Sequence, residues 1–256
     1  MTRFKTVLAS LLISISLTAV AQADHSPETV YQITPYVWAS GLGGDIAPRA
    51  NTQATIDKSA SELLKDLDAA FFLSGYARHG NLVFMGDFST SSSSRGGVTP
   101  SPPAPGPLPA TGKFRQSSVT ALGGYRVAST PEATFDILGG LRHWNLRGEV
   151  DIAPVPPLGF PGVSATRSAS FTDPIVAARG NLLITEGWSA LLYADAGGFG
   201  VGSHRTAQLL GSINYQLSHN AFLSTGYRHL HVDYRSGGAR FDMHMSGPIV
   251  GASIQF

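Results

Sequence analysis

Hydrophobic and polar residues alternate along most of the chain, most cleanly in residues 206–217. There, apolar residues or glycine occupy the odd positions and polar residues the even ones, with Leu210 as the exception. A period of two residues predicts a β-strand. The segment is longer than the usual strand of about 5–6 residues. It matches the roughly 9–11 residues that a tilted strand needs to cross a membrane.

Similar segments recur and predict an all-β, antiparallel, up-and-down transmembrane barrel of ten strands. The predicted strands are residues 29–40, 68–79, 81–92, 113–128, 133–148, 169–183, 187–200, 205–217, 221–236 and 240–256. Tight turns at 79–81, 129–132, 185–187 and 218–220 alternate with long connections at 41–67, 93–112 and 149–168 and with shorter ones at 201–204 and 237–239. Short turns on one side and long loops on the other are typical of outer-membrane barrels. Pairing residues 45–57 within the barrel would give twelve strands, and losing the first hairpin would give eight.

Composition favours a membrane barrel over a soluble lipocalin-like barrel or sandwich. Charged residues make up only 14% of the chain, and the predicted outer faces carry aromatics next to turns, namely Phe135, Trp188 and Phe222. Such aromatics form the interface girdles of membrane barrels. The absence of cysteine excludes disulfides and a thiolate nucleophile. A formal net charge of +1 argues against a nucleic-acid partner.

Residues 1–23 are typical of a secretory signal, with Arg3 and Lys5 before an apolar stretch and a small-residue cleavage site at 21–23. The alternative, an uncleaved membrane helix, is disfavoured because the apolar run is short of about 20 residues. We therefore expect an exported mature domain of residues 24–256 in the outer membrane, with its lipids as partners.

The C-terminus resembles the strand by which the outer-membrane assembly machinery recognises its clients, which implies that machinery as a partner. It carries apolar residues at two-residue intervals: Val250, Ala252, Ile254 and Phe256. The mature chain also resembles a family of uncharacterised bacterial outer-membrane β-barrel proteins. The matching segments are 35–39, 61–67, 173–176, 195–200, 226–228 and 247–248. The resemblance implies an outer-membrane barrel and carries no activity, and residues 93–112 look like an insertion relative to that family.

The alternation directs nine charged residues into the lumen. They are Arg78, Asp87, Arg126, Asp136, Arg142, Asp173, Arg179, Asp195 and Arg228. Unpaired charges in a narrow interior are costly, so we expect a salt-bridge network that fills the barrel. The alternative is a charged constriction that selects solutes.

Three further segments carry hypotheses. Residues 59–67 have the spacing of a two-turn amphipathic helix in the first long loop, either plugging the lumen or exposed. The proline-rich run 99–109 predicts a surface loop rather than a strand, with a polyproline ligand for a partner as the alternative. His229, His231 and Asp233 share one face of a strand near the outer rim. Alternate side chains lie nearly 7 Å apart, too far for one Zn²⁺ or Cu²⁺, so we expect rim polar residues and no metal or cofactor.

We therefore predict a structural or narrow-pore membrane protein without catalysis. One alternative is a rim enzyme, either an omptin-like protease or a lipid-modifying hydrolase, that uses His229, His231, Asp233 and Asp242. The other is a surface-loop binding or adhesion module. A continuous open lumen would favour the pore, an Asp–His pair within hydrogen-bond reach the enzyme, and an apolar outer-loop surface the binder.

Overall fold

The computed structural model describes residues 29–49, 52–58, 67–98, 109–154, 156–158, 161–236 and 239–256. These ranges contain β1 (Thr29–Trp38), β2 (Gly41–Arg49), β3 (Thr52–Lys58), β4 (Leu67–His79), β5 (Leu82–Val98), β6 (Pro109–Ser129), β7 (Ala133–Ile152), the 3-10 helix η1 (Pro156–Leu158), β8 (Val163–Thr185), β9 (Trp188–Gly197), β10 (Arg205–Gln216), β11 (Ala221–Ser236) and β12 (Ala239–Gln255). Nowhere in these ranges is a helix both long and apolar enough to span a bilayer.

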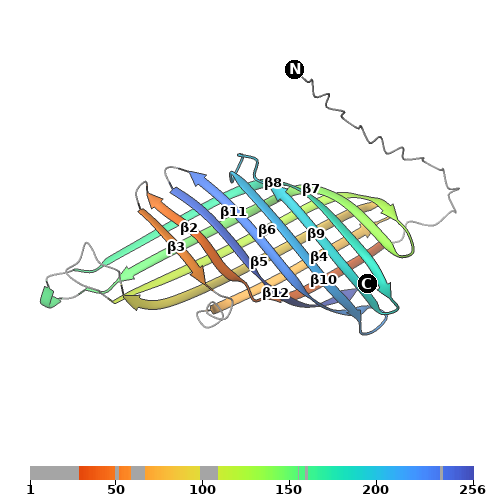
Figure 1. The fold of residues 1–256 in the computed structure, drawn as a ribbon, viewed down its shortest axis with the longest axis horizontal. Coiled ribbons are helices and arrows are strands. Elements are labelled where there is room, and N and C mark those ends of the chain that lie inside the picture. The colour runs from red at the N-terminus through yellow and green to blue at the C-terminus, as the bar shows by residue number, and fades with distance from the viewer. Residues whose placement is uncertain are drawn as a thin grey trace, which may run out of the picture.

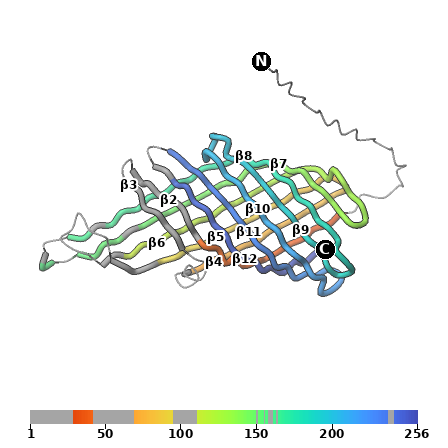
Figure 2. Tube along the Cα trace, in the orientation of Figure 1, coloured from red at the N-terminus to blue at the C-terminus, as the bar shows by residue number. Residues whose placement is uncertain are grey.

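Ten strands close into an antiparallel barrel, which confirms the predicted strand number. The ring runs β1, β4, β5, β6, β7, β8, β9, β10, β11, β12, and β12 pairs back onto β1. The four predicted tight turns join β4 to β5, β6 to β7, β8 to β9 and β10 to β11. They lie with the C-terminus at one end of the barrel (Figures 1 and 2). In an outer-membrane barrel the end with short turns is periplasmic.

The long connection predicted for residues 41–67 is partly wrong, because it contains the hairpin β2–β3. Trp38 pairs with Ile249 and Gly41 with Ser246, so β1 and β2 follow β12 in one continuous register. The outer half of β12 would otherwise present unpaired backbone groups, and β2 pairs with them. The hairpin therefore raises the wall above β1 and adds no strand to the ring, which excludes the twelve-strand alternative.

Strands β5 to β8 continue outward beyond their predicted ends into a tall sheet, seen at the left of Figure 1. β6, β7 and β8 have 21, 20 and 23 residues and stay paired to their tips, where Ile152 faces Val163. Residues 164–168 of β8 are exposed on both faces. A strand segment with water on both faces has no hydrophobic alternation. The sequence pattern therefore predicted strands that are too short at their outer ends.

The barrel wall below this tall sheet has an apolar exterior. Outward residues include Leu209 of β10 and Leu217 directly after it, with 58% and 60% of their surface exposed. Aromatic pairs mark the turn end, with Tyr31 stacked on Phe256 at 5.9 Å and Trp188 against Tyr215 at 4.8 Å between ring centroids. This arrangement is the lipid-facing band and aromatic girdle of a membrane barrel.

Two details of the predicted faces change. Phe135 and Trp188 face outward as expected, at 42% and 44% exposure, but Phe222 lines the lumen. Leu210, the exception in the alternation of β10, also lines the lumen. Both residues contribute apolar surface to an interior that the sequence pattern assigned to polar side chains.

Several inward positions admit only glycine, because neighbouring backbones pass very close. A Cβ on Gly140 would lie 2.1 Å from the carbonyl oxygen of Ala121, and one on Gly226 would lie 2.1 Å from that of Gly211. On Gly247 it would lie 1.9 Å from the Ala39 oxygen, at the junction of β1 and β2. The Gly226 and Gly247 segments of the family resemblance therefore have a structural reason.

We expect Gly247→Ala to impair barrel closure, since rigid backbone cannot move aside as a side chain can. Overpacking alone costs about 1–3 kcal/mol. Gly75→Ala is the matched control, because nothing lies within 4 Å of a Cβ built there. Folded fraction is measured by the gel shift between unheated and boiled samples. Equal folded fractions for the two variants would contradict this account of Gly247.

Several predictions fall on residues outside the described ranges. The signal at 1–23 lies wholly outside them, as do residues 99–108 of the proline-rich run, whereas Pro109 begins β6. The helix predicted at 59–67 is not confirmed. Residues 59–66 lie outside the described ranges, and Leu67 is the first residue of β4.

Candidate functional site in the barrel lumen

The first group of lumen charges centres on Asp136, which is fully buried. Strands β6, β7 and β8 bring Arg126, Asp136 and Arg179 into adjacent register. Arg126 Nε donates to Asp136 Oδ1 at 2.8 Å, and Arg179 Nη1 donates to Oδ2 at 3.2 Å. Tyr76 reaches in from β4, with its hydroxyl accepting from Arg126 at 2.8 Å and its ring 4.5 Å from the Arg179 guanidinium carbon. One carboxylate is thus shared by two guanidinium groups.

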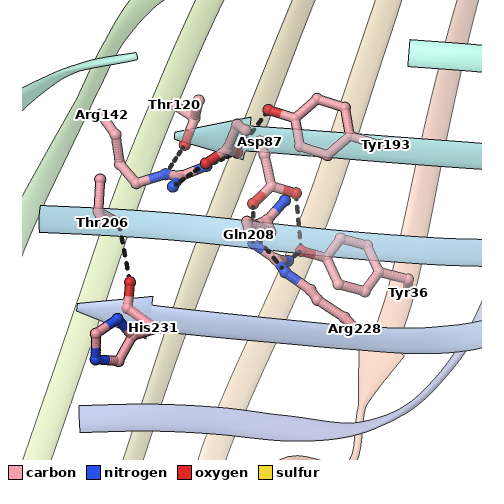
Figure 3. A network of polar contacts seen from close by, with 10 residues as sticks. Tyr36, Asp87, Thr120, Arg142, Tyr193, Thr206, Gln208, Arg228 and His231 are labelled. Carbon is pink, nitrogen blue, oxygen red and sulfur yellow. Dashed lines mark hydrogen bonds and ion pairs between the residues drawn. The ribbon is translucent and has the colours of Figure 1, made fainter. Parts of the chain in front are cut away.

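The second group centres on Arg228 of β11, whose side chain is 2% exposed. Figure 3 shows it beside Tyr36, Asp87 and Gln208. Its Nη1 donates to Tyr36 Oη at 2.6 Å, and its Nη2 donates to Asp87 Oδ1 at 3.3 Å and to Gln208 Oε1 at 2.7 Å. Tyr36 in turn donates to Asp87 Oδ2 at 2.8 Å. Because β5 and β11 lie on nearly opposite walls of the ring, this group crosses the lumen.

The third group is the pair of Arg142 and Asp195, joined by two parallel hydrogen bonds of 3.1 and 2.6 Å. Tyr193 donates to Asp195 at 2.7 Å, and Arg142 Nε donates to Thr120 at 3.0 Å (Figure 3). The Arg142 side chain is 2% exposed and that of Asp195 is 0% exposed. Bidentate geometry with further hydrogen bonds offsets the cost of burying both charges.

Two of the nine predicted lumen residues belong to none of these three groups. Asp173 is fully buried, but it accepts hydrogen bonds from the backbone nitrogen and hydroxyl of Ser203, at 2.5 and 2.9 Å, and so holds the loop between β9 and β10. Arg78 lies near the turn end and donates to the Gly80 carbonyl at 3.1 Å. The structure thus assembles the other seven into three groups.

Above the charges lies an apolar layer that the sequence analysis missed. Ten buried residues from β1, β4, β7, β8, β11 and β12 form it: Trp38, Phe72, Trp144, Leu146, Phe171, Leu230, Val232, Met243, Met245 and Ile249. Phe171 of β8 stacks on Tyr234 of β11 at 4.2 Å between centroids, across the gap above the shorter β9 and β10. A signal for this layer was present on β7, where inward residues change from Arg142 to Trp144 and Leu146.

Below this layer the lumen contains a cavity of about 340 Å³. Its lining reaches Gln255, Asn181 and Ser189, which lie close to the periplasmic strand ends. It ends upward at residues such as Arg228 and Ile249. The lumen therefore has a periplasmic vestibule beneath a packed outer half.

Of the predicted rim residues, His229 and His231 face the exterior of the wall rather than the lumen, whereas Asp233, at an alternate position of the same strand, is buried at 6% exposure. His231 Nε2 lies 2.9 Å from Asp242 Oδ1, and the two side chains are 30% and 32% exposed. His229 hydrogen-bonds Ser246 and lies 6.4 Å from His244 between rings. Asp233 pairs with Arg235 at 2.6 Å. Across the described ranges, three or more potential ligands nowhere gather closely enough to hold a metal ion.

Two further histidines, at positions 143 and 204, also lie outside the charge groups. His143 hydrogen-bonds Thr172 on the exterior face of β7, and the backbone nitrogen of His204 donates to the Asp233 carbonyl. The C-terminal residues Val250, Ile254 and Phe256 are 52%, 57% and 66% exposed on the outer surface. Phe256 exchanges two backbone hydrogen bonds of 2.9 Å with Tyr31, so the C-terminus closes the ring.

Solved structures of outer-membrane barrels resemble this fold at very low sequence identity. The outer-membrane protease OmpT from Escherichia coli has a TM-score of 0.55 at 9% identity, covering 92% of this chain and 99% of its own. The translocator domain of autotransporter NalP from Neisseria meningitidis has 0.49 at 11%, covering 91% and 90%, and Ail from Yersinia pestis has 0.38 at 11%, covering 89% and 98%. What this chain shares with OmpT is the fold.

No family model and no curated protein matches the chain. The closed antiparallel ring, the apolar exterior and the charged interior together define an integral outer-membrane β-barrel protein.

Proposed function

We propose that this barrel is a non-conducting structural protein of the outer membrane rather than a pore or an enzyme. The observation that supports it is the packing of the outer half of the lumen, where Trp38, Trp144 and Leu230 are at most 4% exposed although they point inward. Residues that line an aqueous channel are wetted, whereas these three belong to one buried apolar cluster.

The charge groups below the apolar layer support the same proposal. Arg228 contacts Asp87 from the opposite wall and lies 4.6 Å from the Trp38 ring centroid, so it ties the ionic and apolar parts together. A barrel of ten strands encloses a far narrower lumen than that of open porins, which have 16–18 strands. Side chains therefore suffice to close it.

We further propose two classes of partner. The apolar band makes membrane lipid the surrounding partner of the wall. The alternating exposed residues of the last strand, ending at Phe256, are suited to recognition by the barrel assembly machinery before the strand pairs with β1.

The rim enzyme has one observation in its favour, the His231–Asp242 pair within hydrogen-bond distance. The pair lies on the outward face of β11 and β12, and neither residue lines the lumen cavity. The surface-binding alternative would be favoured by an apolar surface on the outer loops. Phe199 and Val201 are 62% and 74% exposed, but the exposed tip of β8 is mainly serine, threonine and alanine. Neither alternative is supported as well as the closed barrel.

The proposal is tested by solute efflux from liposomes. We expect vesicles that carry the mature protein to retain small solutes as well as protein-free vesicles do. A double variant, Trp38→Ala with Trp144→Ala, removes the two largest side chains of the apolar layer and is expected to leak faster. Efflux through the unmodified protein, with insertion verified by the gel shift, would contradict the proposal.

A further inference from the structure

The exterior of β5 to β8 changes in regular steps from the membrane band toward the tall sheet (Figure 1). The register of these four strands is unbroken here, so residues that pair directly form rows across the sheet. Phe88, Val119 and Leu141, exposed by 37%, 49% and 55%, mark the outer edge of the apolar band. Beyond this edge comes an uncharged row, made of Thr90, Ser117, Asn145 and Ser170.

The next row outward places two arginines side by side. Arg115 of β6 pairs directly with Arg147 of β7, and Ser92 of β5 and Ser168 of β8 flank them. Both arginines are exposed. Residues in this relation have Cβ atoms about 5 Å apart, and like charges there repel each other. Neither guanidinium forms a hydrogen bond or an ion pair with any residue that the structure describes.

The carboxylates on the exterior of β6 and β7 lie farther from the membrane than the two arginines. Glu149 is one row farther out, where it pairs with Lys113. Asp151 is another row out and accepts a hydrogen bond from the Ser164 hydroxyl at 2.7 Å. Along these two strands, the first permanently charged side chains beyond the apolar band are therefore both positive.

The arginine pair lies at a height that a lipid headgroup occupies. Arg115 is four residues beyond Val119, which is about 13 Å along the strand and about 10 Å along the membrane normal for a tilt near 40°. The headgroup layer on each side of the hydrocarbon core is roughly 5–8 Å thick. An arginine can lay its apolar stem along the wall and extend its charged end toward this layer. The Arg115 guanidinium therefore reaches the headgroups, with Arg147 beside it.

We propose that the arginine row, consisting of Ser92, Arg115, Arg147 and Ser168, binds the phosphate of one anionic lipid headgroup in the outer leaflet. A phosphate between the two guanidinium groups replaces their repulsion with paired, charge-assisted hydrogen bonds. The serine hydroxyls provide further donors.

Two features favour a lipid over a soluble anion as the occupant. The charge of the arginine pair complements a phosphate, and the surface beneath the pair continues into the apolar band, which receives the acyl chains. The proposal rests on membrane lipid as the partner of the wall. It is independent of conduction, because the arginine row is on the exterior of the barrel.

The test is native mass spectrometry of the folded protein, residues 24–256, in a non-ionic detergent with added dioleoyl phosphatidic acid or dioleoyl phosphatidylcholine. We expect one saturable site for phosphatidic acid. Phosphatidylcholine should bind more weakly, because its choline group is repelled by the arginines. Inorganic phosphate at the same concentration should not displace the bound phosphatidic acid, since it has no acyl chains to contact the band.

Arg115→Gln and Arg147→Gln should each weaken phosphatidic acid binding by roughly tenfold, as expected for the loss of one charge-assisted hydrogen bond. Both variants should fold, because neither side chain has a partner among the described residues, and the gel shift verifies this. Arg167→Gln is the matched control. Arg167 is exposed at nearly the same level, but it pairs with Gly148 and so lies on the other face of the sheet, and its loss should leave the affinity unchanged.

Equal affinities for the three variants would overturn the proposal, and so would equal binding of the two lipids. Displacement by inorganic phosphate would also overturn it, because the row would then bind a free anion. The efflux test of the closed lumen depends on none of these outcomes, so the two proposals can fail separately.

Discussion

Replacing Asp136 with alanine is expected to lower the free energy of unfolding by about 3–5 kcal/mol, the cost of removing one member of a buried ion pair. Asp136 is fully buried and accepts from both Arg126 and Arg179. Without it, two guanidinium groups remain in a low-dielectric interior with no carboxylate between them. The loss is measured by urea unfolding of the protein in lipid vesicles, followed by tryptophan fluorescence.

Glu186→Ala is the control for removing one negative charge, because Glu186 is exposed in the turn between β8 and β9. Its effect should stay within about 0.5 kcal/mol, as for most surface substitutions. The loss of unfolding free energy for Asp136→Asn should fall between those for Asp136→Ala and Glu186→Ala, since the amide oxygen still accepts a hydrogen bond. If Asp136→Ala proves as stable as Glu186→Ala, the ion pairs that Asp136 forms with Arg126 and Arg179 do not stabilise the barrel.

The second large effect is expected for Trp144→Ala, at about 3–5 kcal/mol, because the substitution leaves a cavity in a packed apolar layer. Trp144 is 2% exposed and lies 6.4 Å from Phe171 between ring centroids. The same unfolding measurement applies, with the remaining tryptophans as reporters.

Two further substitutions separate packing from other contributions of this residue. The indole Nε1 of Trp144 is buried and has no hydrogen-bond partner among the residues that the structure describes. Trp144→Phe removes that donor while keeping an aromatic ring, so its cost should be much smaller than that of alanine. Trp188→Ala removes a tryptophan that is 44% exposed on the exterior and should also cost less. Equal losses for Trp144→Ala and Trp188→Ala would mean that the interior layer is not packed.

Strand number and order could be predicted because the lipid-facing half of every strand obeys one simple rule. In β10, for example, outward leucine, isoleucine and tyrosine alternate with inward threonine, glutamine and serine. The rule fails where the environment changes. Residues 164–168 at the outer end of β8 are exposed on both faces, and β2 is a strand because β12 offers a free edge.

The same alternation predicted that the charged side chains point inward, but it did not predict which residues they contact. Arg228 contacts Asp87 across the ring, and Asp173 contacts a loop serine instead of an arginine. Both depend on how strands far apart in sequence face one another. Periodicity likewise gives the shared face of His229 and His231 but not its direction, since a polar face above the membrane band can turn either way.

The most direct test of the closed lumen is planar-bilayer recording of residues 24–256, with insertion verified independently. The packed outer half predicts a silent membrane with no discrete current steps, whereas Trp38→Ala combined with Trp144→Ala should produce them. Regular, salt-dependent steps from the unmodified protein would contradict the closed barrel and identify a pore.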